Sequence, residues 1–213
     1  LVELLVVIAI IAALAAMATP VIMKQNKKAA MTEATSNAKQ IFYLMVEFDQ
    51  DFGEFPSIDS ATEIDYTGTG ITSASTTSND FFNQFIAGGY TTSEEIFYAK
   101  STLTKKPNNA LKANSLSKGE CGFAYISEQS TSDNSGRPIV MAPMEETGQT
   151  FDPDPYDNKA VVLRLDGAVK QLRINNSKEV IITGTTTLFS QGEDTVWGTS
   201  GFVSADLKKP VPK

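Results

Sequence analysis

One apolar stretch at the start of the chain, Leu1–Met23, constrains the fold more than any other feature. Its sequence is LVELLVVIAIIAALAAMATPVIM, and Glu3 is its only charged residue. About 20 apolar residues are enough to cross a bilayer as a helix, and the run Leu4–Met23 reaches that length. A carboxylate at the edge of such a run is costly unless a positive group meets it. We therefore expect the rest of the chain to support this segment or to be carried by it.

Two general interpretations of this stretch rest on its composition alone. A cleaved secretory signal peptide is one, because Ala16-Met17-Ala18 has the small-x-small pattern of a cleavage site. Against it, the sequence shows no basic region beside the apolar run, and we expect Glu3 to fit badly inside the apolar region of a signal. The other is a plain membrane anchor whose Glu3 side chain reaches back to the interface.

The residues Leu1–Ala12 (LVELLVVIAIIA) closely resemble the class III signal of type IV pilins and type II secretion pseudopilins. In that family a prepilin peptidase cuts before the motif, usually at Gly-Phe, and methylates the new N-terminus. The usual Phe-Thr before Leu1 is absent here, so we expect two mature residues to precede Leu1. Pro20 stands where pilins usually carry a helix-weakening proline, whereas Ala12 stands where the family often has glycine.

The resemblance implies roles for particular residues. Glu3 would form a salt bridge with the N-terminal amine of an adjacent subunit, and Pro20 would mark where the assembled helix loosens. We expect the apolar surface to face lipid before assembly and neighbouring helices afterwards, with its alanines permitting close approach. The residues expected in the filament core are Leu4, Leu5, Val7, Ile8, Ile11, Ala12, Leu14 and Ala15.

The helix is predicted to continue to about Phe52. Apolar residues recur every three or four positions over Met31–Phe52, which places them on one helical stripe. Gly53 is a natural end to the helix. The segment Asp51–Pro56 also resembles the acidic–aromatic–Gly–x–aromatic–Pro turn of major pseudopilins, and we expect its two phenylalanines to pack under the head.

Three lysines, Lys24, Lys27 and Lys28, separate the apolar stretch from this stripe. Two interpretations stay open at this point. The lysines mark the membrane boundary and contact lipid head groups during insertion, or they form a solvated helix face.

The rest of the chain predicts an α+β, pilin-like head with an antiparallel sheet and short helices. Asn79–Ala87 has the pattern of a helix capped by Ser78 or Asn79, after a polar loop over Thr67–Ser78. We divide the chain into a filament-core half-helix (1–23), an amphipathic half-helix (24–53) and the head (54–213). The head comprises a helical and loop part (54–118), a β-rich part (119–205) and an exposed tail (206–213). The predicted strands are Gly122–Ser127, Pro138–Ala142, Ala160–Leu165, Ala168–Ile174 and Glu179–Thr183, the third and fourth joined by a type I′ turn at Asp166-Gly167.

The composition argues against enzymatic chemistry and against nucleic acid. The chain has no histidine, which removes His-based triads and nearly all zinc ligand sets, and we find no nucleophile–base set. Cys121 is the only cysteine, so no intrachain disulfide is possible, and we expect it to be buried and inert. A net charge of −7 disfavours nucleic acid as a partner.

One loop carries the residues for a metal site. Phe151–Asn158 (FDPDPYDN) gathers oxygen ligands just before the predicted hairpin, and Ca²⁺ takes six to eight oxygens. Related major pseudopilins hold calcium near the C-terminal sheet. The alternative is an exposed Pro/Asp turn. If calcium binds, we expect Asp152, Asp154 and Asp157 to be its ligands.

The predicted function is that of a filament subunit. The chain would polymerise through its N-terminal helix into a type IV pilus-like or type II secretion pseudopilus filament. Its partners would be copies of itself, the prepilin peptidase and the inner-membrane assembly machinery. It would reside in the inner membrane and then in a periplasmic or extracellular filament on the cell surface. The alternative is a membrane-anchored surface protein that binds a ligand and does not polymerise.

Overall fold

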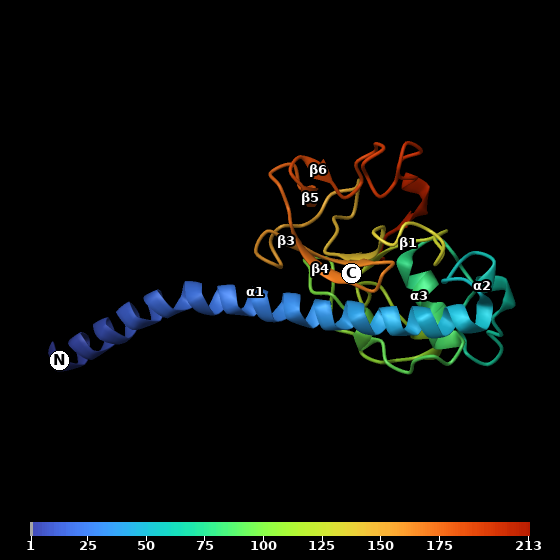
Figure 1. Cartoon of the computed structure of the whole chain (residues 1–213). Helices are drawn as coiled ribbons and strands as arrows, with labels where there is room; N and C mark the ends of the chain where they lie inside the picture. The colour runs from blue at the N-terminus through green and yellow to red at the C-terminus, as the bar shows by residue number, and fades with distance from the viewer. Residues whose placement is uncertain (1) are drawn as a thin grey trace.

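The computed structural model describes residues 2–213, in which one long helix carries a head built around a sheet (Figure 1). The long helix is α1 (Val2–Phe52). The short helices are α2 (Ser60–Glu63), α3 (Ser78–Ala87), η1 (Glu95–Phe97), η2 (Lys112–Asn114) and η3 (Ser204–Asp206). The strands are β1 (Ala124–Ile126), β2 (Pro138–Ala142), β3 (Lys159–Arg164), β4 (Val169–Arg173), β5 (Ile181–Thr183), β6 (Thr186–Thr187) and β7 (Leu207–Lys208). The predicted α+β class is confirmed.

The helix α1 confirms the predicted course of the chain as far as Gly53. At 1.5 Å per residue its length is about 77 Å. Gly53 ends it with a φ of +75°, a conformation that costs glycine nothing, and the Gly53 N–H donates to the Asp49 carbonyl at 2.8 Å. The predicted stripe Met31–Phe52 is confirmed as the buried face of the second half, except that Phe52 is only half-buried. The buried residues are Ala30, Met31, Ala34, Ala38, Ile41, Met45 and Phe48.

A five-stranded antiparallel sheet with the order β4-β3-β2-β1-β7 forms the centre of the head. Four of its strands, β1 to β4, lie close to their predicted positions, and β2 matches Pro138–Ala142 residue for residue, whereas β7 was not predicted. A second, two-stranded sheet pairs β5 with β6. The register of β3 on β4 places Leu163 opposite Val169 next to the hairpin turn.

Both faces of the large sheet are covered. Alternate residues along a strand point to opposite faces, and in the central strands β1, β2 and β3 nearly all residues are buried. Tyr125, Val161 and Leu163 pack with α1 and α3 in one core, whereas Ile126 and Val162 belong to a second core with Trp197. Figure 1 accordingly shows α1 on one side of the sheet and the β5–β6 segment on the other.

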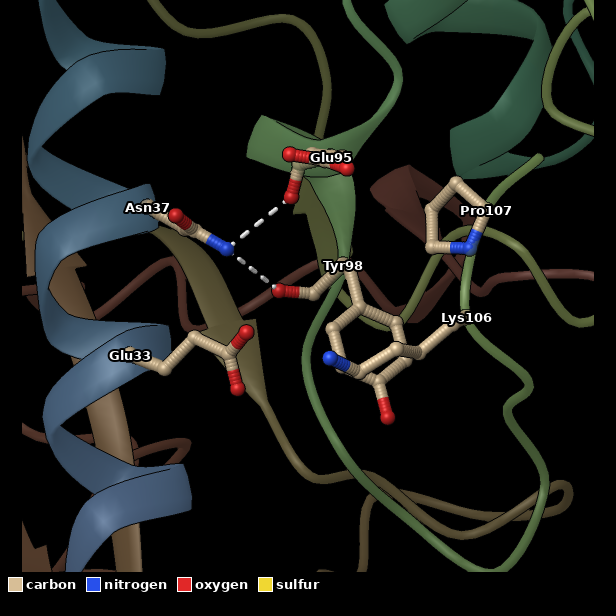
Figure 2. Close-up of a pocket in the computed structure, with 6 residues that line it drawn as sticks. All are labelled: Glu33, Asn37, Glu95, Tyr98, Lys106 and Pro107. Carbon is tan, nitrogen blue, oxygen red and sulfur yellow. Dashed lines mark hydrogen bonds between the residues drawn. The ribbon is translucent and has the colours of Figure 1, made fainter. Parts of the chain in front are cut away.

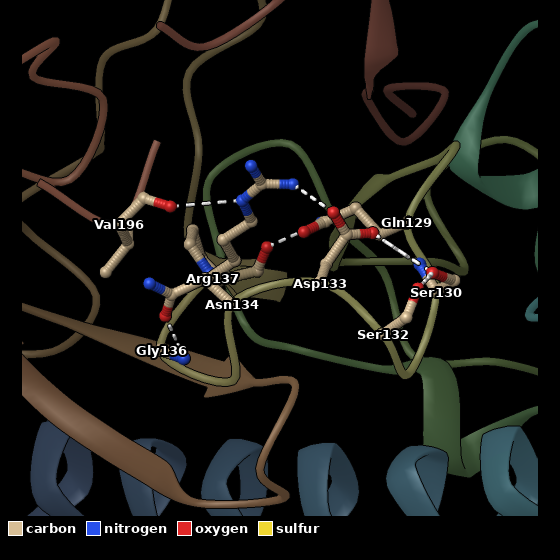
Figure 3. Close-up of polar contacts among 9 residues, drawn as sticks. Gln129, Ser130, Ser132, Asp133, Asn134, Gly136, Arg137 and Val196 are labelled. Carbon is tan, nitrogen blue, oxygen red and sulfur yellow. Dashed lines mark hydrogen bonds and ion pairs between the residues drawn. The ribbon is translucent and has the colours of Figure 1, made fainter. Parts of the chain in front are cut away.

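A polar clamp holds the outer layer to the sheet (Figure 3). The Arg137 side chain donates through Nε to the Val196 carbonyl at 3.1 Å and pairs with Asp133 through Nη1. Its guanidinium also lies 5.3 Å from the centre of the Trp197 ring. Trp197 belongs to the second core with Ile126 and Val162, and only 6% of the residue is exposed.

The hairpin between β3 and β4 is present, but its turn is not type I′. A type I′ turn needs a positive φ at both central residues, and here Gly167 has φ +75° while Asp166 does not have a positive φ. The Arg164 N–H donates to the Ala168 carbonyl at 3.1 Å and the Gly167 N–H donates to the Arg164 carbonyl at 2.9 Å. The loop is therefore a three-residue connection with a glycine bulge, which a single left-handed glycine satisfies.

The helix α3 lies where it was expected, one residue longer at its start. Its cap is Thr77 rather than Ser78 or Asn79, because Asp80 completes a capping box with Thr77. Ser78 is instead buried, and its hydroxyl donates to the Phe123 carbonyl at 2.7 Å. The apolar face of α3 meets α1, with the Phe85 and Phe48 rings edge to face at 5.4 Å.

The prediction of an exposed tail is wrong. Residues 207–212 are half-buried, and β7 pairs with β1 as the outermost strand. Beyond β7, the Val211 carbonyl accepts from the Gly119 N–H at 2.8 Å and the Lys213 N–H donates to the Leu103 carbonyl at 3.0 Å. By pairing with β1, the tail covers an edge of the sheet that would otherwise have unpaired backbone groups.

Candidate assembly segment and its junction with the head

The first half of α1 projects from the head as an uncovered apolar helix (Figure 1). Val2–Met23 is exposed along its whole length, with Leu4 67% and Ile11 60% exposed. Within residues 2–213, α1 is the helix that is long and apolar enough to cross a membrane. Burying roughly ten such side chains at about 2 kcal/mol each is worth on the order of 20 kcal/mol. That exceeds the usual net stability of a domain, so this surface needs lipid or other helices.

The residues expected in the filament core lie within this projecting helix. Glu3 occupies its first turn, where the helix dipole favours a carboxylate, and it is exposed in the single chain. The predicted core residues are likewise exposed and available to a partner: Leu4, Leu5, Val7, Ile8, Ile11, Ala12, Leu14 and Ala15.

Pro20 lies inside α1 without ending it. Proline lacks the N–H that would bond the carbonyl one turn earlier, so it weakens the helix locally. The Thr19 hydroxyl donates to the Ala15 carbonyl at 2.8 Å in the same turn. Figure 1 shows that the projecting part of α1 changes direction before it reaches the head, and proline is a common cause of such bends.

The lysines after the apolar half meet the acidic loop that precedes β3. Lys27 Nζ lies 2.6 Å from Asp154 Oδ1, and Lys24 Nζ lies 4.0 Å from Asp157 Oδ2. The sequence interpretation missed this pairing, although the opposite charges of the two segments were its visible signal. The junction between α1 and the head is thus partly electrostatic.

The three aspartates proposed for calcium do not form a metal site by themselves. In the described chain, no three acidic, cysteine or histidine side chains are grouped closely enough to hold a metal ion. Asp152 accepts from the Asp154 N–H at 3.0 Å and from the Thr102 hydroxyl at 3.2 Å, while Asp154 and Asp157 face lysines. Calcium binding stays a prediction, and a melting temperature unchanged by a chelator would remove it.

Hydrogen bonds on the other side of α1 fix the helix to the loop around η1 (Figure 2). The Asn37 amide donates to the Glu95 carbonyl at 3.0 Å and to the Tyr98 carbonyl at 2.9 Å. These groups, with Glu33 and Lys106, line a hollow of about 140 Å³. We interpret this contact as structural, because one side chain of α1 supplies hydrogen bonds to two backbone carbonyls of the loop.

The free cysteine does not offer a reactive site. Cys121 is fully buried, and burial raises the pKa of its thiol to about 12. The thiol is therefore protonated at neutral pH, whereas the nucleophile is the thiolate. The expectation that Cys121 is buried is confirmed.

Comparisons with known proteins leave the family open. No protein-family model, curated protein or solved structure matches the chain. The long apolar N-terminal helix followed by a sheet-containing head is consistent with a pilin-like shape.

Proposed function

We propose that the chain is a structural subunit that polymerises through α1 into a type IV pilus-like or type II secretion pseudopilus filament. One observation carries the proposal: an exposed apolar helix, Val2–Met23, continues without interruption into the amphipathic helix that holds the head. A continuous helix without a flexible linker connects the position of each packed helix to that of its head. A simple anchor would need no such continuity.

The same surface has two successive environments in this proposal. Before assembly, lipid covers the apolar half, whose 20 residues Leu4–Met23 match a bilayer core of about 30 Å. After assembly, neighbouring copies replace lipid, with small residues such as Ala12 and Ala15 at helix contacts. The partners are other copies, the prepilin peptidase and the inner-membrane assembly machinery. The filament then lies in the periplasm or on the cell surface.

Glu3 supplies the test of assembly. A buried carboxylate without a partner is unfavourable, so in a filament Glu3 needs the N-terminal amine of a neighbour. We expect Glu3→Ala to remain in the membrane fraction and to lose filaments in electron micrographs of cells. Glu63→Ala, which removes an exposed glutamate of α2, is the matched control and should keep filaments.

The two readouts separate the alternatives. Filaments at wild-type number in Glu3→Ala cells would reject the assigned role of Glu3. Absence of filaments in wild-type cells, with the chain in the membrane, would instead favour the surface-anchored binding protein. Loss of filaments from cells lacking the prepilin peptidase would connect assembly to the processing motif.

A further inference from the structure

A basic hollow lies where the apolar half of α1 meets the head. It measures about 260 Å³. Its lining consists of Lys24, Lys28, Met31, Tyr156, Asp157 and Lys159. The lysines come from two distant parts of the chain, α1 and the first residue of β3.

The charge of the hollow is opposite to that of the whole chain. Three lysines and one aspartate line it, in a chain whose net charge is −7. The pair of Lys24 with Asp157 is long, at 4.0 Å, and more than half of each side chain is exposed, so it contributes little. Within residues 2–213, Lys28 and Lys159 have no ion-pair partner.

The hollow also lies at a defined depth, which rests on the proposed membrane state of the subunit. Leu4–Met23 covers about 30 Å as a helix, the thickness of a hydrocarbon core. Lys24 and Lys28 therefore stand at the level of the lipid phosphates. Lys159 lines the same hollow, so the head adds a third ammonium group at this level.

We propose that this hollow binds the phosphate of an anionic phospholipid head group while the subunit is in the membrane. Lys24, Lys28 and Lys159 donate hydrogen bonds to phosphate oxygens, and their aliphatic stems lie along the apolar boundary. Lys27 takes no part, because Asp154 already pairs with it. The lipid would fix the orientation of the head over the bilayer before assembly.

Hydrogen exchange of the full chain in nanodiscs tests the proposal. Discs of phosphatidylcholine alone are compared with discs that also contain phosphatidylglycerol. We expect slower amide exchange around Lys28 and Lys159 with phosphatidylglycerol. Each of Lys28→Gln and Lys159→Gln should reduce that protection roughly fivefold. Lys118→Gln removes an exposed lysine elsewhere on the head and should leave the protection unchanged.

The possible outcomes distinguish failure of the proposed lipid site from failure of the proposed function. Insertion into both discs with no effect of phosphatidylglycerol overturns the lipid site and leaves the proposed function standing. Failure to insert into either disc overturns both. Equal protection by inorganic phosphate in phosphatidylcholine discs assigns the hollow to free phosphate, not lipid. Protection that rises with the number of chains per disc, without phosphatidylglycerol, assigns it to an acidic group of a second copy.

Discussion

Gly167 lies in the turn of the β3–β4 hairpin, against Phe42 of the long helix. A Cβ at this position would lie 2.5 Å from the Phe42 ring, and the backbone φ is +75°. Its carbonyl accepts from Lys39 Nζ at 2.8 Å. Both the left-handed conformation and the close approach therefore require glycine.

Gly167→Ala should lower the free energy of unfolding by about 2 kcal/mol or more, combining a left-handed alanine with displacement of Phe42. Gly184→Ala is the control, because Gly184 also has a positive φ, +57°, but nothing lies within 4 Å of its added Cβ. The control should cost only about 1 kcal/mol in denaturant unfolding. Equal losses for the two variants would show that Phe42 does not restrict the site.

Glu94 gives the head a specific pH dependence. The residue is fully buried, and its Oε1 accepts from the Leu116 N–H at 2.7 Å. Burial, together with the nearby charge of Glu120, raises the pKa of Glu94 above its ordinary value of 4.5. As pH rises, the Glu94 carboxyl loses its proton at a lower pH in the unfolded chain than in the folded one. The protonated carboxyl therefore adds its full contribution to the free energy of unfolding below pH 4.5, and this contribution is lost as pH rises through the raised pKa.

Glu94→Gln should therefore lose less stability than the wild type between pH 4.5 and neutrality, as measured by urea unfolding across that range. The amide retains an acceptor for the Leu116 N–H and carries no charge to bury. Glu95→Gln, which changes the exposed neighbour, should follow the wild-type curve. A Glu94→Gln curve parallel to the wild type would mean that Glu94 is not the group responsible.

At the scale of elements, the N-terminal cap of α3 is expected to contribute to the stability of the head. Thr77 accepts from the Asp80 N–H, and the Asp80 carboxylate accepts from the Thr77 N–H at 2.8 Å. Thr77→Ala should cost about 1 kcal/mol in thermal or denaturant unfolding. Thr72→Ala, in the exposed loop before it, should stay within about 0.5 kcal/mol of the wild type. A loss no larger than that of Thr72→Ala would show that the packing of Phe85 suffices without the cap.

The elements themselves were largely predictable because their signals are local. The apolar run, the three- and four-residue stripe and Gly53 define α1, and β-branched runs define β2 and β3. The cap of α3 was misassigned by one residue because Thr77 and Ser78 are both good caps and only the Asp80 contact decides between them.

Contacts between distant residues were not predictable from local patterns. Lys27 and Asp154 are 127 residues apart, and no periodicity links them. Taken alone, the carboxylates of the acidic loop suggested a calcium site. In the fold, two of its aspartates pair with lysines of α1. The basic hollow was missed for the same reason, since Lys159 joins Lys24 and Lys28 only through the tertiary structure.

At the scale of the whole molecule, the second half of α1 is inseparable from the head. Its buried stripe shares one core with α3 and the sheet, so a force on the apolar half is transmitted to the head without a flexible linker. The only proline of α1, Pro20, lies in the projecting half, away from that core. Bending is thus confined to the part that lipid or neighbouring helices must cover.

The C-terminal tail joins three separate parts of the head, and this makes a further prediction. Removing Leu207–Lys213 deletes β7 and the main-chain hydrogen bonds that the tail makes to Ser78, Gly119 and Leu103. At about 1 kcal/mol for each hydrogen bond, the loss should be about 3 kcal/mol or more.

The truncated chain should also aggregate, because β1 becomes an open edge strand. Unfolding and light scattering of the detergent-solubilised full chain and its truncation measure the two effects. Lys213→Ala is the control, since it keeps the bond from the Lys213 N–H to the Leu103 carbonyl, and it should behave as the wild type. A truncated chain of wild-type stability would show that the tail does not stabilise the head.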